Sequence, residues 1–189
     1  MFVDHTAETA PPAARRILTS TESRLGYVPV AMARMAEAPQ LLDGFLKLSG
    51  MFETTSLDPL ARETLIMTIA RRNGCHVCVA MHTAKLTGLS APPSVIAALR
   101  DGGPLDDARL EAVRRFTEDV MDAAGGVGEE RVAEFLAHGY TRRHALEVVL
   151  GIGTYTLSTM ANRLTEAPLD DSLRDYAWTP SHQVNSTIG

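Results

Sequence analysis

Apolar residues recur along most of the chain at intervals of three or four, the spacing of an amphipathic helix, and alternating runs typical of strands are nearly absent. In the segment 39–53 one apolar stripe consists of Leu41, Leu42, Phe45, Leu48, Met51 and Phe52. Proline or an N-capping acid begins several such segments and glycine ends them. We therefore predict helices over about residues 12–24, 30–37, 39–53, 58–72, 75–88, 92–100, 106–123, 129–137 and 141–163.

These segments predict an all-α fold, a compact bundle of short helices joined by turns rich in glycine and proline. We expect a single domain over residues 1–189, with a core of about 12–178 and a tail of 180–189. The linker 101–104 marks a possible division, but each half would be close to the lower size limit for a hydrophobic core.

The last predicted helix shows an apolar stripe interrupted by glycine. The residues expected to face one way are Leu146, Val149, Ile152, Thr156 and Met160. Gly151 and Gly153 weaken this helix but permit the close approach of a neighbour.

The net charge of −5 and the absence of a basic block argue against nucleic acid and anionic membranes as partners. The longest nearly apolar stretch, 148–160, is too short to span a bilayer. Residues 1–16 lack the apolar run of a secretory signal. We therefore expect a cytoplasmic protein.

The chain has two cysteines, Cys75 and Cys78. A disulfide stabilises a fold by closing a long loop, and a two-residue spacer constrains almost nothing. This pair therefore calls for a chemical explanation.

Both cysteines lie one turn apart at the start of a predicted helix, so their sulfurs can meet. The helix N-terminus favours a thiolate, and on this ground alone Cys75 is the more acidic thiol. His82 follows on the same side of the helix and can transfer protons near neutral pH. Glu63, on the preceding helix, is directed toward an apolar face, so it needs a partner or a raised pKa. Together they form a candidate dithiol site with a proton relay.

Each of these residues also has a structural interpretation, because buried cysteines behave as small apolar residues and a histidine or glutamate can simply be solvated. Zinc bound by Cys75, Cys78, His82 and Glu63 is a second chemical alternative, although structural zinc sites usually combine two separated ligand pairs. His76 is expected to point away from the sulfurs. We interpret His5, His138, His144 and His182 as surface residues.

The pattern Glu63, eleven residues, Cys75-x-x-Cys78, three residues, His82 resembles the alkylhydroperoxidase D-like members of the carboxymuconolactone decarboxylase family. The resemblance is strong over about residues 40–90 and looser near 160–164. It implies an all-α fold that assembles into trimers or hexamers. It also implies peroxide reduction, with Cys78 attacking, Cys75 resolving, and Glu63 and His82 as the relay.

We therefore expect a thiol-dependent peroxidase that reduces alkyl hydroperoxides without a bound organic cofactor or metal. Its partners would be the hydroperoxide, a dithiol or thioredoxin-like protein reductant, and other copies of the chain. A disulfide reductase or redox sensor would use the same residues. A lactone decarboxylase on the same scaffold is a further alternative, in which the cysteines would be incidental.

Overall fold

The structure of the protein is a computed structural model that describes residues 2–179, so the expected tail lies outside the described residues. This part of the chain contains nine α-helices, one 3₁₀ helix and no strand, which confirms the all-α prediction. It has no helix that is both long and apolar enough to cross a membrane. The elements are α1 (Pro12–Leu25), α2 (Val30–Met35), α3 (Pro39–Glu53), α4 (Pro59–Arg72), α5 (His76–Gly88), α6 (Pro93–Asp101), α7 (Ala108–Asp122), α8 (Glu129–Ala137), α9 (Arg142–Leu164) and η1 (Asp171–Tyr176).

The helix ends follow local sequence signals. The carboxylate of Asp58 accepts a hydrogen bond from the backbone N–H of Ala61, and Pro59 occupies the first position of α4. At the C-terminal end of α1, Gly26 adopts a left-handed conformation with φ of 82°. Thr141 and His144 cap the start of α9 reciprocally. These interactions explain why the predicted boundaries lie within a few residues of the observed ones.

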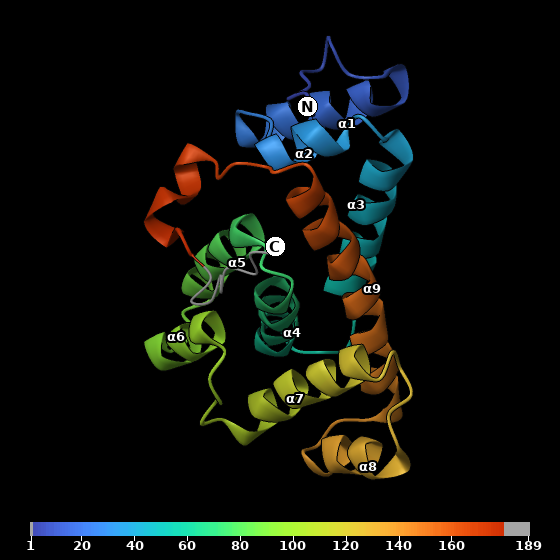
Figure 1. Cartoon of the computed structure of the whole chain (residues 1–189), viewed down its shortest axis with the longest axis vertical. Helices are drawn as coiled ribbons and strands as arrows, with labels where there is room; N and C mark the ends of the chain where they lie inside the picture. Colours follow the sequence, from blue (N-terminus) through green and yellow to red (C-terminus); the bar gives the residue numbers. More distant parts are fainter. Residues whose placement is uncertain (1, 180–189) are drawn as a thin grey trace, which may run out of the picture.

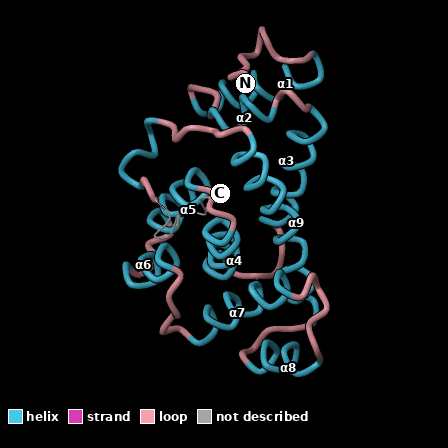
Figure 2. Tube along the Cα trace, viewed as in Figure 1, coloured by secondary structure: helices cyan, strands magenta, loops and turns pink. Residues whose placement is uncertain are grey.

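Helix α4 forms the centre of the molecule and packs against α5, α7 and α9 (Figures 1 and 2). Helix α3 lies alongside α9, and α6 packs on α5. Helices α1 and α2 lie at one end of the molecule and α8 lies at the other. Because α4 is surrounded, its residues 63–70 are all buried, including the charged Glu63.

The described residues form two clusters of buried apolar side chains. The larger one surrounds α4 and includes Leu65, Ile66 and Phe52. The smaller one, with Leu18 and Leu42, lies among α1, α2 and α3. The larger cluster contains both cysteines, so the candidate site is built into the main core.

The predicted apolar stripe of α9 does not face the core. Leu146, Val149 and Met160 are 73%, 50% and 60% exposed, and Ile152 and Thr156 are only partly buried. The opposite side of α9 faces α4, and it consists largely of small and polar residues: Glu147, Val148, Gly151, Thr154, Tyr155, Ser158, Thr159, Ala161 and Asn162. The helix packs through this side because small residues allow close approach and most of the polar atoms find hydrogen-bond partners among the described residues, with Oδ1 of Asn162 as an exception.

Candidate active site

Helices α4 and α5 meet in a tight turn whose geometry positions Cys75. Gly74 has a φ of 64°, a conformation that glycine adopts without strain. Its N–H donates to the carbonyl of Arg71, and the N–H of Cys75 donates to the carbonyl of Ala70. This pair of bonds is the Schellman pattern that closes a helix. The backbone of Cys75 therefore takes part in the C-terminal cap of α4, and the same residue is the N-cap of α5.

The side chain of Cys75 caps the start of α5. Its Sγ accepts the backbone N–H of Cys78 at 3.3 Å, and the two cysteines form a disulfide. The expectation that the two sulfurs meet is thus confirmed. Both cysteines are buried, with Cys75 1% and Cys78 5% exposed.

Glu63 of α4 and His82 of α5, which flank the cysteines in the sequence motif, form a buried pair. The Nδ1 atom of His82 lies 2.7 Å from Oε2 of Glu63. An ionised carboxylate only accepts hydrogen bonds, so Nδ1 carries the donated proton and Nε2 is the nitrogen available for exchange. Helical spacing places His82 one turn after Cys78 on the same side of α5. The structure thus brings the four predicted residues to the packed pair α4 and α5.

Lys85 completes the environment of Glu63. Its Nζ lies 2.9 Å from Oε1 of Glu63 and also pairs with Glu53. Burial works against ionisation of Glu63, but the hydrogen bonds and charges of His82 and Lys85 outweigh it and hold the pKa of the carboxyl below its usual value. Burial likewise works against the charge of Lys85, but Glu53 and Glu63 raise its pKa. Of the two alternatives for Glu63, a partner or a raised pKa, the structure shows the partner.

Helix α9 contributes side chains to the cysteine turn from the other side. Nδ2 of Asn162 lies 3.3 Å from Sγ of Cys78 and 3.8 Å from Sγ of Cys75. The carbonyl of Asn73, in the turn, accepts a hydrogen bond from Arg163 at 2.7 Å. The turn is therefore held between its own helix pair and the end of α9.

Sequence reasoning missed three residues around this site. Lys85 lies three positions after His82 and was within reach of helical spacing arguments. Tyr155 packs its ring edge-on against His82, with centroids 5.6 Å apart, and Asn162 contacts the sulfurs. Both lie on α9, more than 70 residues from His82 in sequence, so no local pattern indicated them.

The remaining described histidines lie apart from the relay. His76 is exposed. His5 is less accessible than expected, because its side chain is only 11% exposed and pairs with a glutamate after α2 at 2.6 Å. His138 and His144 bond to the backbone of nearby residues, and His182 lies outside the described residues.

The zinc alternative finds no preformed site. Within residues 2–179, histidine, cysteine, aspartate and glutamate side chains form no group of three or more arranged to hold a metal ion. The two sulfurs that zinc would need as thiolates are bonded to each other.

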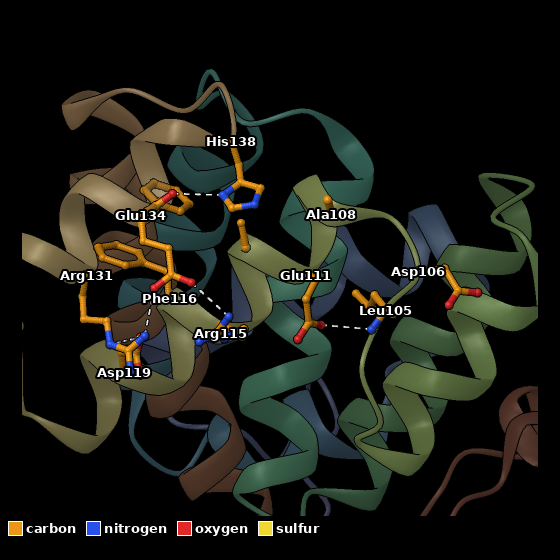
Figure 3. Close-up of a pocket in the computed structure, with 12 residues that line it drawn as sticks. Leu105, Asp106, Ala108, Glu111, Arg115, Phe116, Asp119, Arg131, Glu134 and His138 are labelled. Carbon is orange, nitrogen blue, oxygen red and sulfur yellow. Dashed lines mark hydrogen bonds and ion pairs between the residues drawn. The ribbon is translucent and has the colours of Figure 1, made fainter.

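A pocket of about 230 Å³ lies between α7 and α8 and contains none of the predicted site residues (Figure 3). Stacked Phe116 and Phe135 form part of its wall. Arg115 and Arg131 are paired with Glu134 at 2.9 Å and 2.8 Å. Because these charges already satisfy one another, we assign no chemistry to this pocket.

Comparison with known proteins agrees with the resemblance seen in the motif. Residues 39–119 match the model of the Carboxymuconolactone decarboxylase family. No curated protein matches the chain. The resemblance is confirmed over this segment, which contains α3 to α7 and all four predicted site residues.

Solved structures share the fold. A protein from Ralstonia eutropha JMP134, described as an alkylhydroperoxidase AhpD core and an uncharacterized peroxidase-related protein, superposes with a TM-score of 0.79 at 19% identity, covering 91% of this chain and 93% of that one. An uncharacterized peroxidase-related protein from Silicibacter sp. TM1040 gives 0.72 at 20% identity, with 86% and 87% covered. The debrominase Bmp8 in complex with 2,3,4-tribromopyrrole gives 0.67 at 18% identity, with 87% and 89% covered. The chain therefore has the alkylhydroperoxidase AhpD-like fold.

Proposed function

We propose that the protein is a thiol-dependent peroxidase that reduces alkyl hydroperoxides through a cycle between the dithiol and disulfide forms of Cys75 and Cys78. The observation that carries the proposal is the position of this disulfide, at the start of α5 and one helical turn before a buried His82–Glu63 pair. A cysteine pair with so short a loop adds little stability, so its chemistry accounts for its presence.

In the first step, His82 accepts the proton of the Cys78 thiol, and the thiolate attacks the terminal oxygen of the hydroperoxide. A sulfur–oxygen bond forms and the oxygen–oxygen bond breaks. The departing alkoxide takes the proton back from His82 and leaves as an alcohol, while Cys78 becomes a sulfenic acid. Glu63 orients His82 through Nδ1 and stabilises its charged form.

In the second step, the thiol of Cys75 attacks the sulfur of the sulfenic acid. The disulfide forms, and the hydroxide released combines with the proton of Cys75 to give water. An external dithiol or a thioredoxin-like protein then supplies two electrons and two protons and is itself oxidised. Cys78 is the attacking residue in this scheme, as the resemblance to the alkylhydroperoxidase D-like members implies, and Cys75, whose side chain caps α5, is the resolving residue.

The test is a count of free thiols in the reduced protein before and after one equivalent of an alkyl hydroperoxide. We expect two thiols to disappear and peptide mapping to recover Cys75 joined to Cys78. With a dithiol reductant, Cys78→Ser should abolish peroxide consumption and Cys75→Ser should stop the cycle at the sulfenic acid. The exposed His76 provides a control, because His76→Ala should keep the wild-type rate. Wild-type rates in both cysteine variants would remove the basis of the proposal.

The family model is named for a decarboxylase and one structural neighbour is a debrominase, so this fold carries more than one kind of reaction. A disulfide reductase or redox sensor would show the same thiol loss without sustained peroxide turnover. A lactone decarboxylase would retain full activity on a lactone acid without either cysteine. Stoichiometric zinc in protein purified without added metal would favour the metal alternative.

We further propose that the protein is cytoplasmic, where reducing dithiols are available, and that it works as a homo-oligomer of three or six chains. The outer side of α9 supports the assembly. Leu146, Val149, Met160 and Leu164 form an exposed apolar face on one long helix, and we call this set the α9 outer face. Apolar residues gathered on a surface in this way mark contacts with other chains.

A further inference from the structure

Asn162 is the side chain of α9 that donates to the disulfide. Its Nδ2 atom lies 3.3 Å from Sγ of Cys78 and 3.8 Å from Sγ of Cys75. Asn162 is 5% exposed, so water does not compete effectively for this donor. A disulfide sulfur is a weak acceptor, whereas a thiolate is a strong one. The contact therefore becomes stronger when Cys78 is reduced and its thiol is ionised.

The side-chain amide of Asn162 directs its Nδ2 donor toward sulfur and leaves its Oδ1 acceptor without a hydrogen bond from any described residue. Oδ1 of Asn162 is buried and has no hydrogen-bond partner among the described residues. A buried unsatisfied carbonyl is costly and rare in native proteins, so its presence calls for an explanation. Asn162 also lines a hollow of about 570 Å³ together with Gly74, His76 and Arg163. Asn162 thus lines the hollow and contacts the sulfur of Cys78 with the same side chain.

We propose that the side-chain amide of Asn162 is a catalytic group, whose Nδ2 stabilises the negative charge of the Cys78 sulfur in the reduced protein. The role rests on the proposed dithiol chemistry and adds a residue to it. The backbone N–H at the start of α5 is directed to Cys75, and the amide donor lies closer to Cys78. The start of α5 thus gives Cys75 a backbone donor, and Asn162 of α9 gives Cys78 a side-chain donor.

The experiment must separate this hydrogen bond from the other charges near the turn. Those charged and titratable groups are His76, His82 and Lys85 on α5, Glu63 on α4, Arg163 on α9, Glu166 just after α9, and Asp171, Arg174 and Asp175 on η1, which packs on α5. All of them remain in place in the variants compared, so their contribution cancels.

The measurement is the pH titration of the Cys78 thiolate, followed by its ultraviolet absorbance in a Cys75→Ser background, where Cys78 is the only thiol. Asn162→Leu keeps most of the side-chain volume and Asn162→Ala removes it, and both lose the donor. A hydrogen bond to a charged group of ordinary strength predicts that the ionisation midpoint rises by about one pH unit in both variants. Asn73→Ala is the matched control, because Asn73 donates to Thr159 rather than to sulfur. Its midpoint should stay at the value of the background protein.

The titration uses no peroxide, so its outcome is independent of the proposed peroxidase activity. A raised midpoint in both Asn162 variants supports the catalytic role even if peroxide is not consumed. Circular dichroism and thermal unfolding show whether each variant is folded. Unchanged midpoints in a folded Asn162→Leu protein, with or without lower stability, would reduce Asn162 to a packing residue and overturn the proposal.

Discussion

At the residue scale, Glu63 is a charged group almost without solvent contact in the core of the protein. Burial alone would raise the pKa of its carboxyl, but His82 and Lys85 provide two charged or hydrogen-bonding partners at 2.7 Å and 2.9 Å. The net effect is a lowered pKa. A carboxyl group of this kind stabilises the folded state when it is ionised.

We expect Glu63→Gln to lower the free energy of unfolding at neutral pH by about 1–3 kcal/mol, because a charge-assisted hydrogen bond becomes a neutral one and Lys85 loses a partner. The folded pKa of Glu63 lies below its unfolded value of about 4.5. Its contribution is therefore complete above the unfolded pKa and is lost as the pH falls through the folded pKa. Chemical denaturation at a series of pH values should show the difference between wild type and variant shrinking in acid. A difference of constant size would contradict this.

Glu147 offers a matched control for the role of Glu63 in chemistry. It too is buried and has a lowered pKa, because burial is outweighed by hydrogen bonds from Ser56 and Arg143. Glu147→Gln should lose stability in the same pH range and keep the rate of the proposed peroxidase reaction. Glu63→Gln should lose about two orders of magnitude in that rate, the usual contribution of a proton relay. Equal losses in both variants would make Glu63 a structural residue.

At the scale of the element, α9 depends on a glycine at its contact with α3 and α4. A Cβ atom built on Gly151 would lie 2.7 Å from both Cδ2 of Leu65 and Cε2 of Phe52. Real Cβ atoms do not approach so closely, so a side chain at this position would force the buried Leu65 and Phe52 to move. Gly153, which the sequence placed in the same role, has no neighbour within 4 Å of such an atom among the described residues.

We expect Gly151→Ala to destabilise the protein by about 1–3 kcal/mol, because the new methyl group must displace Leu65 and Phe52. Gly50→Ala on α3 is the control, since a Cβ there meets nothing within 4 Å. That change should stabilise the protein by about 0.5–1 kcal/mol through helix propensity alone. Thermal and denaturant unfolding measure both values. Stabilisation in both variants would show that the helices separate without cost.

At the scale of the whole molecule, α9 has two different sides. One packs on α4 and holds the cysteine turn, and the other is the α9 outer face, with Leu146 and Leu164 each 73% exposed. Exposed apolar side chains along a single 23-residue helix are unfavourable in water unless another surface covers them. This arrangement supports the proposed homo-oligomer.

We expect the wild-type protein to sediment at a multiple of its 20.4 kDa chain mass. Replacing Leu146 and Met160 by Glu should shift it to the mass of one chain, because charges in an apolar interface remain unpaired. Leu25→Glu changes a half-exposed leucine on α1, far from this face in the sequence, and should leave the mass unchanged. A double variant that keeps the wild-type mass would place any interface elsewhere.

Local signals in the sequence were sufficient for most of the fold. Pro39 and Asp58-Pro59 mark helix starts, and Asn73-Gly74 marks a helix end, because caps depend on neighbouring residues only. The spacing of Cys75, Cys78 and His82 was enough to place three site residues on one helix side, since helical geometry is regular. Periodicity alone did not tell which side of α9 is buried.

The sequence by itself thus determined the helices, the cysteine pair and the acid–base partners next to it, because each rests on interactions a few residues apart or on adjacent helices. Only the tertiary structure decided that His82 and Lys85 together hold Glu63 ionised, and that Gly151 meets Phe52. It also showed that Asn162 reaches the sulfurs from α9. These contacts join residues distant along the chain, and their geometry comes from the packing of whole helices rather than from any local pattern.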